Sequence, residues 1–187
     1  MNIMIVGVGG QGTLLASRIL GSAVTEAGYD VKLSEVHGMS QRGGSVVTYV
    51  KFGKKVYSPI IDKGEADIIL AFECLEAYRA LPWLKKGGKM IVNDQKINPM
   101  PVIIGAAEYP EDIIEKLTSV CDVTHINALG MAEKAGSIKA VNVVLIGVMA
   151  KNTGIPYDAW VRAVKNNVPE KYVEINLKAF DEGYGVE

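Results

Sequence analysis

The chain of 187 residues has only two cysteines, Cys74 and Cys121, and only two histidines. Two cysteines are too few for a disulfide framework, and without a CxxC pair this chain alone cannot build a cysteine-ligated iron–sulfur cluster. No His, Cys or carboxylate cluster has metal-ligand spacing, so we expect no metal site.

An excess of one charge is also lacking, because 20 Lys and Arg residues face 21 Asp and Glu residues. Nucleic-acid binders usually carry a basic excess, so no nucleic-acid partner is expected. The longest apolar run, residues 143–150, is far shorter than the roughly 20 residues of a membrane span. The first residues show neither a basic segment nor a signal-peptide cleavage site. We therefore expect a cytoplasmic protein without a membrane contact, which also fits unpaired cysteines.

Hydrophobic residues make up 49% of the chain, which is enough for a substantial core. We expect a single domain over residues 1–187. Residues 3–6 predict a buried strand, residues 13–27 a helix and residues 30–36 a second strand, which is a Rossmann-like start. Residues 45–52 alternate like a strand, and a turn at Gly53 with a return at residues 56–58 predicts an inserted β-hairpin.

Further along the chain, a helix at residues 73–84 and a turn at Gly87 and Gly88 are expected to separate strands 66–72 and 89–93. A short strand at 102–104, a helix at 111–119 and a strand at 122–126 follow. Helices are then expected at 128–135, 139–152, 156–167 and 170–182. The predicted architecture is a three-layer α/β/α domain with a mixed sheet and a helical C-terminal third.

The first candidate site is a GxGxxG segment that follows a strand and opens a helix. Its residues are Gly7, Gly9, Gly10, Gln11 and Gly12, with Val8 between the first two. Three interpretations are open: close strand–helix packing, a ligand or partner group at the helix N-terminus, or NAD. An acidic residue about 20 positions later would support NAD, but Asp30 and Glu35 lie 18 and 23 residues after Gly12, and neither decides the matter.

The second candidate site follows the second strand, at the sheet edge where ligands of parallel α/β sheets collect. Its residues are His37, Met39, Ser40, Gln41, Arg42, Gly43 and Gly44. The Arg42 guanidinium can make a bidentate contact with a carboxylate or phosphate. The alternative is a solvated loop with one surface arginine.

Two further residues stand out. Asn142 interrupts an apolar helix face, so its amide is either packed or reaches toward the glycine loop. Cys74 follows a strand, and we expect a small buried side chain there rather than an activated thiol. No Walker motif, nucleophile elbow, HExxH or thiamine-type Gly-Asp-Gly segment is present, so no catalytic residue is assigned.

The segments GVGGQG at 7–12 and HGMSQRGGSV at 37–46 resemble the gamma-type domain of 2-oxoacid:ferredoxin oxidoreductases. The resemblance continues through KVYSPII at 55–61, residues 64–93 and Ala140-Val141-Asn142, so it covers nearly the whole chain. HGMSQRGG and YSPII look most like the indolepyruvate branch. A gamma subunit of a pyruvate, 2-oxoisovalerate or 2-oxoglutarate complex is the alternative.

The resemblance implies a small, non-catalytic subunit that is inactive alone. A large partner subunit would carry thiamine diphosphate and iron–sulfur clusters, none of which this chain would bind by itself. The complex would convert an aryl-2-oxoacid, with CoA and ferredoxin, to an aryl-acetyl-CoA and CO₂. The two glycine loops would face the partner's cofactor site or the CoA channel. A free-standing NAD(P)- or nucleotide-binding module is the alternative of a different class, and tight NADH binding would favour it.

Overall fold

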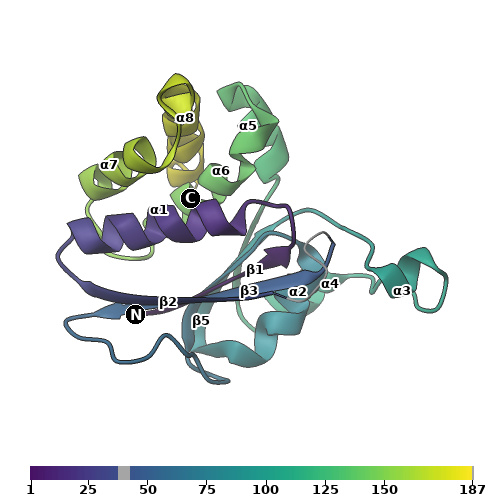
Figure 1. The fold of residues 1–187 in the computed structure, drawn as a ribbon. Coiled ribbons are helices and arrows are strands. Elements are labelled where there is room, and N and C mark those ends of the chain that lie inside the picture. The colour runs from purple at the N-terminus through teal and green to yellow at the C-terminus, as the bar shows by residue number, and fades with distance from the viewer. Residues whose placement is uncertain (38–42, 187) are drawn as a thin grey trace.

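A six-stranded mixed sheet forms the middle layer of the computed structural model, which describes residues 1–37 and 43–186 (Figure 1). The strand order is β2-β3-β1-β4-β5-β6. Of these strands only β3 runs opposite to the others, because it pairs antiparallel with both β1 and β2. The strands are β1 Asn2–Val8, β2 Asp30–His37, β3 Ser45–Gly53, β4 Ala66–Ala71, β5 Leu84–Asn93 and β6 Asp122–Ile126.

Helices bury both faces of the central strands, which is why these strands are apolar at successive positions rather than at alternate ones. On β1, Ile3 and Ile5 face one hydrophobic core, and Met4 and Val6 face the other. The three-layer α/β/α prediction is confirmed by this arrangement.

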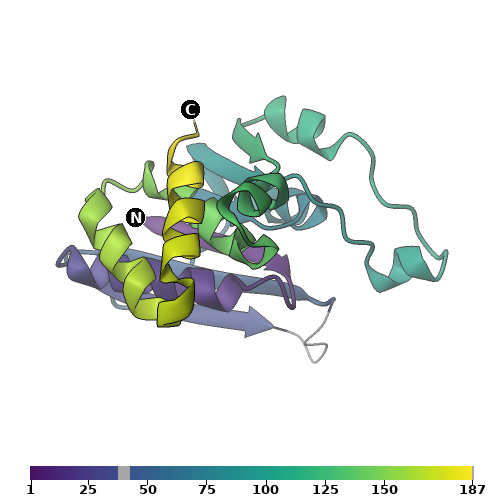
Figure 2. The same ribbon diagram turned by 90° about the horizontal axis from the view of Figure 1, so that it is seen from above.

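The thicker helical layer holds the first helix and the C-terminal third of the chain. It contains α1 Thr13–Glu26, α5 Ala128–Ala135, α6 Val141–Ala150, α7 Tyr157–Asn167 and α8 Val173–Tyr184. Short 3-10 helices at Ile138–Ala140 and Glu170–Tyr172 precede α6 and α8. Seen from above, α7 and α8 lie over the sheet together with α1 (Figure 2). None of the helices in the described ranges is long and apolar enough to cross a membrane.

The thinner layer on the other face consists mainly of α2 Cys74–Ala80 and α4 Ile113–Thr118. A 3-10 helix at Leu81–Trp83, with Pro82 in its first turn, follows α2. The remaining helix, α3 Met100–Ile103, projects beside the body of the molecule (Figure 1).

The inserted hairpin is formed by β2 and β3, and the prediction that residues 56–58 return against β3 is wrong. The reason is that β3 already pairs on one side with β2 and on the other with β1, so neither of its edges is free. Residues 56–58 lie in a loop instead, where the Val56 amide donates a hydrogen bond to the Asp30 carboxylate at 2.9 Å.

Two smaller predictions are also wrong. Gly87 and Gly88 lie inside β5 rather than in a turn, and the register of β5 against β4 shifts between Ala66 and Ile68. A Cβ atom on Gly88 would lie 3.0 Å from the Ala66 carbonyl oxygen, so the close strand contact needs glycine. The expected strand at 102–104 is the helix α3, since Pro99 and Pro101 suit a first helical turn.

The crossing of α6 and α8 gives a test of the packing. A Cβ atom on Gly147 would lie far inside van der Waals contact with the Phe180 carbonyl oxygen, and one on Gly183 would do the same with Val144. We expect Gly147→Ala to lower the free energy of unfolding by about 1–3 kcal/mol, because the two backbones must separate. Urea unfolding measures this change.

Gly21→Ala is the matched control, because a Cβ atom on this α1 glycine would have no heavy atom within 4 Å. We expect that variant to gain about 0.5–1 kcal/mol from the better helix propensity of alanine. Equal stability changes in the two variants would contradict the tight crossing of α6 and α8.

Candidate functional site

The first glycine loop makes a tight turn between β1 and α1. Gly10 and Gly12 have φ angles of 102° and 82°, a region that favours glycine. A Cβ atom on Gly7 would lie 2.9 Å from Gln11 Oε1 and 3.0 Å from the Phe72 Cβ atom. Gly12 is the N-cap residue of α1 and has no side chain to cap the helix. The N-terminal N–H groups of α1, a favourable place for an anionic group, therefore lie at the sheet edge.

The second glycine loop meets the first through the backbone. The Gly9 amide donates to the Gly44 carbonyl at 2.9 Å, and the Gly43 amide donates to the Gly9 carbonyl at 3.4 Å. Gly43 has a φ angle of 73°. The two loops predicted to share one edge of the sheet therefore touch each other at this point, although β1 and β2 are not neighbours in the sheet.

The predicted site residues Met39, Ser40, Gln41 and Arg42 lie outside the described residues. His37 ends β2, and its backbone is in register with Val46 of β3.

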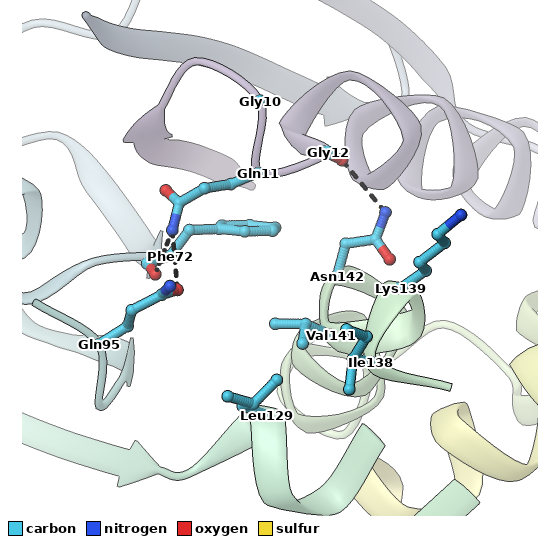
Figure 3. A pocket seen from close by; sticks show the side chains of 10 residues that line it. All are labelled: Gly10, Gln11, Gly12, Phe72, Gln95, Leu129, Ile138, Lys139, Val141 and Asn142. Atoms are coloured by element: carbon cyan, nitrogen blue, oxygen red, sulfur yellow. Dashed lines mark hydrogen bonds between the residues drawn. The ribbon is translucent and has the colours of Figure 1, made fainter. Parts of the chain in front are cut away.

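Gln11 ties the first loop to the ends of two strands. Its Oε1 accepts a hydrogen bond from the Val8 amide at 2.7 Å. Its Nε2 donates to the Phe72 carbonyl at the end of β4 and to the Gln95 Oε1 atom just beyond β5, both at 3.0 Å. These bonds fix the glycine loop relative to the parallel strands (Figure 3).

A buried polar network that we did not predict continues along the same edge. The Asn93 side chain, 1% exposed, donates to the Phe72 carbonyl and accepts from the Ala128 amide at the start of α5. The equally buried Glu73 carboxylate accepts from the amides of Glu76 and Ile97 and from the Tyr109 hydroxyl.

Glu73 and Gln95 lie just beyond β4 and β5, and Asn93 is the last residue of β5. The rule that chemistry gathers beyond the carboxyl ends of parallel strands could therefore have found Glu73, Asn93 and Gln95. Burial, together with the Glu73 carboxylate, raises the pKa of Tyr109, which keeps the hydroxyl a donor throughout the ordinary pH range.

A pocket of about 390 Å³ opens between the first glycine loop and the corner before α6. Figure 3 shows its lining, which combines the α1 N-terminus with the cationic side chain of Lys139. The lining residues are Gly10, Gln11, Gly12, Phe72, Gln95, Leu129, Ile138, Lys139, Val141 and Asn142.

The Asn142 amide reaches the first glycine loop, which is one of the two placements that the sequence left open. Its Nδ2 atom donates to the Gly12 carbonyl at 3.3 Å (Figure 3). The side chain is only 5% exposed, and its Oδ1 atom has no hydrogen-bond partner among the described residues. A buried acceptor without a partner costs stability, so packing alone does not explain an asparagine here.

On the other side of the loop, a second pocket of about 380 Å³ brings Glu35 near Gly9, Gly10 and Gly12. In a Rossmann dinucleotide site, the strand that carries the acidic ribose-binding residue lies directly beside the first strand. Here β3 separates β2 from β1, which moves Glu35 outward by one strand spacing, about 4.8 Å. Asp30, the other acidic candidate, lies at the far end of β2 and pairs with Lys32. The geometry therefore disfavours NAD.

The two cysteines do not fit an iron–sulfur cluster. Cys74 is 1% exposed, and its thiol contacts the Asn93 carbonyl, whereas the Cys121 thiol contacts the Leu117 carbonyl. Burial raises the pKa of the Cys74 thiol, so the expectation of a buried, unactivated side chain is confirmed. Within residues 1–37 and 43–186, no three His, Cys, Asp or Glu residues are grouped to hold a metal ion.

The fold and this edge define an α/β domain with two joined glycine loops and with pockets on either side of the first loop. The family model described as pyruvate ferredoxin/flavodoxin oxidoreductase matches residues 2–186. The chain belongs to this family.

Two relatives and one solved structure show where the chain falls within the family. It is 43% identical to indolepyruvate oxidoreductase subunit IorB of Pyrococcus horikoshii, over 97% of this chain and 93% of that one. It is 26% identical to the pyruvate/ketoisovalerate oxidoreductases common subunit gamma of Thermococcus kodakarensis, over 95% and 92%. The keto/oxoacid ferredoxin oxidoreductase gamma subunit of Geobacter sulfurreducens matches with a TM-score of 0.73 at 27% identity, over 98% and 95%.

The two buried asparagines at this edge allow a direct comparison. Asn142→Leu removes one hydrogen bond and one unpartnered acceptor, so we expect the free energy of unfolding to stay within about 1 kcal/mol of the wild type. Asn93→Leu leaves the buried Phe72 carbonyl and Ala128 amide without that partner, and we expect a loss of at least about 2 kcal/mol. Denaturant titrations measure both values. A larger loss for Asn142→Leu than for Asn93→Leu would show that Asn142 serves mainly stability.

Proposed function

We propose that the chain is the small subunit of an indolepyruvate:ferredoxin oxidoreductase and works in the cytoplasm with a large catalytic subunit. Residues 1–187 would form a single gamma-type domain. The complex would oxidatively decarboxylate an aryl-2-oxoacid with CoA, giving an aryl-acetyl-CoA, CO₂ and reduced ferredoxin. The small subunit would contribute binding and positioning groups rather than a reacting group.

The observation that carries this proposal is the difference in similarity between the two kinds of relative. Identity is 43% to an indolepyruvate oxidoreductase subunit and 26% to a pyruvate/ketoisovalerate gamma subunit, at nearly the same coverage. Because both comparisons span almost the whole chain, one shared motif cannot account for the gap.

The edge of the sheet where β1, β4 and β5 end, which we call the carboxyl edge, suits a surface that faces the partner. Gly10 allows another group to approach the backbone closely, because a Cβ atom there would have no heavy atom within 4 Å. The N-terminus of α1 and the Lys139 ammonium favour an anionic group, such as a phosphate of the CoA co-substrate or a carboxylate of the large subunit. Gln11 and Asn142 would hold this surface in shape.

Thiamine diphosphate and iron–sulfur clusters would belong to the large subunit, where they would supply the decarboxylation and electron-transfer chemistry. No residue of this chain is assigned to either group, because its cysteines and carboxylates do not form a suitable donor set among the described residues.

The test is reconstitution with the large subunit, followed by ferredoxin reduction with a panel of 2-oxoacids. We expect kcat/KM for indolepyruvate to exceed that for pyruvate or 2-oxoglutarate by at least about tenfold, since a pocket for an aryl group discriminates against small substrates. The isolated chain should be inactive and free of iron. Preference for pyruvate or 2-oxoglutarate would contradict the indolepyruvate assignment. Tight NADH binding by the isolated chain would favour a nucleotide-binding module.

A second prediction concerns Arg42, which would position an anionic substrate, CoA or a partner carboxylate. Losing a charged hydrogen bond of this kind costs about 1.5–3 kcal/mol, so Arg42→Ala should lower complex affinity or turnover about tenfold or more. Arg42→Lys should rescue poorly, because an ammonium lacks the planar fork.

Arg18→Ala, at an exposed position on α1, is the matched control and should change neither quantity by more than about twofold. Wild-type assembly and turnover in Arg42→Ala would leave Arg42 as a solvated surface residue.

A further inference from the structure

Residues 98–108, which we call the arm, leave the body of the molecule between β5 and α4. The arm contains the single-turn helix α3, which projects to the same side in both views (Figures 1 and 2). No strand and no other helix of the described residues packs extensively on α3. The arm is therefore not part of either hydrophobic core.

The composition of the arm is unusual for a solvated loop. Its sequence, NPMPVIIGAAE, has one charged residue, Glu108. Met100, Ile103 and Ile104 are 65%, 64% and 69% exposed. Three large aliphatic side chains in one short segment form the kind of exposed apolar surface that marks a protein–protein contact.

The arm is nevertheless shaped by its own hydrogen bonds. The Ala106 and Ala107 amides both donate to the Pro101 carbonyl, at 2.8 and 3.1 Å, and the Ile104 amide donates to the Met100 carbonyl at 3.0 Å. Pro99 and Pro101 restrict the backbone further. A segment that is already shaped loses less conformational entropy on binding than an unstructured one does.

The base of the arm is fixed by one buried carboxylate. Glu73 Oε1 accepts from the Ile97 amide before the arm, at 3.0 Å, and from the Tyr109 hydroxyl after it. The Leu75 amide donates to the same hydroxyl at 3.1 Å. Glu73, at the start of α2, thus holds both ends of the arm, and Ile97 lies two residues after Gln95, which lines the glycine-loop pocket.

We propose that the arm docks into an apolar groove on the large catalytic subunit. This inference rests on the proposed function. The arm begins at the carboxyl edge of the sheet, so a protein that covers this edge can also reach Met100, Ile103 and Ile104. One continuous interface would then comprise the glycine loops, which offer polar and anion-binding groups, and the arm, which offers an apolar anchor.

The experiment measures the affinity of the full-length chain for the large subunit. We expect Ile103→Asp, and more strongly Ile103→Asp with Ile104→Asp, to raise Kd by about 100-fold or more, because a buried apolar anchor is replaced by a carboxylate. Val120→Asp is the matched control, because Val120 is also 64% exposed but precedes β6 at the opposite edge of the sheet. The melting temperatures of all variants should stay within about 2 °C of the wild type, since surface changes cost little.

Equal losses of affinity in the Val120 and Ile103 variants, or no loss in either, would overturn the proposal. Sedimentation of the isolated chain tests whether the arm instead docks onto a second copy of this chain. A wild-type dimer that Ile103→Asp converts to a monomer, with unchanged affinity for the large subunit, would assign the arm to that second copy. If the wild-type chain fails to bind the large subunit, the proposed function itself fails. If the wild-type chain binds the large subunit and the arm variants bind it equally well, the proposed role of the arm is refuted and the proposed function is not.

Discussion

The position of β3 is the constraint on which the candidate site depends. Because β3 runs antiparallel between β1 and β2, its first residues lie beside the last residues of β1, and Gly44 meets Gly9. Ser45, which opens β3, also donates a hydrogen bond to the buried Glu76 carboxylate of α2. The same placement separates β2, which carries the acidic residues, from β1 and its glycine loop. In a dinucleotide site the corresponding two strands are neighbours. This strand order therefore brings the two glycine loops together at one edge of the sheet, and it disfavours a nucleotide site there.

The edge combines a rigid frame with groups that still lack partners. Glu73, Asn93 and Gln11 have their hydrogen bonds within the chain, and together they connect the ends of β1, β4 and β5 to α5 and to the base of the arm. Asn142 Oδ1 has no partner among the described residues, and the arm exposes aliphatic side chains to solvent. A satisfied polar network beside an exposed apolar arm is what a domain needs when a second protein completes its surface.

Local signals predicted much of the fold. Helix α5 and strand β6 have the predicted bounds, and Gly43 and Gly44 lie at the predicted edge, because apolar periodicity and glycine placement act over short distances. Strand pairing was less predictable: residues 56–58 resemble a returning strand, but whether β3 has a free edge depends on long-range contacts. The buried Glu73 and Asn93 escaped because each resembles a surface residue in sequence, and several of their hydrogen-bond partners lie 21 to 36 positions away.

Amide hydrogen exchange of the small subunit, alone and with the large subunit, tests most directly whether the carboxyl edge faces the partner. Protection should increase over residues 7–12, 43–46 and 97–108, because two glycine loops and the arm would become buried together. Residues 84–89, at the opposite edge, should exchange at the same rate in both samples. Protection over residues 84–89, with the glycine loops and the arm unchanged, would contradict the account.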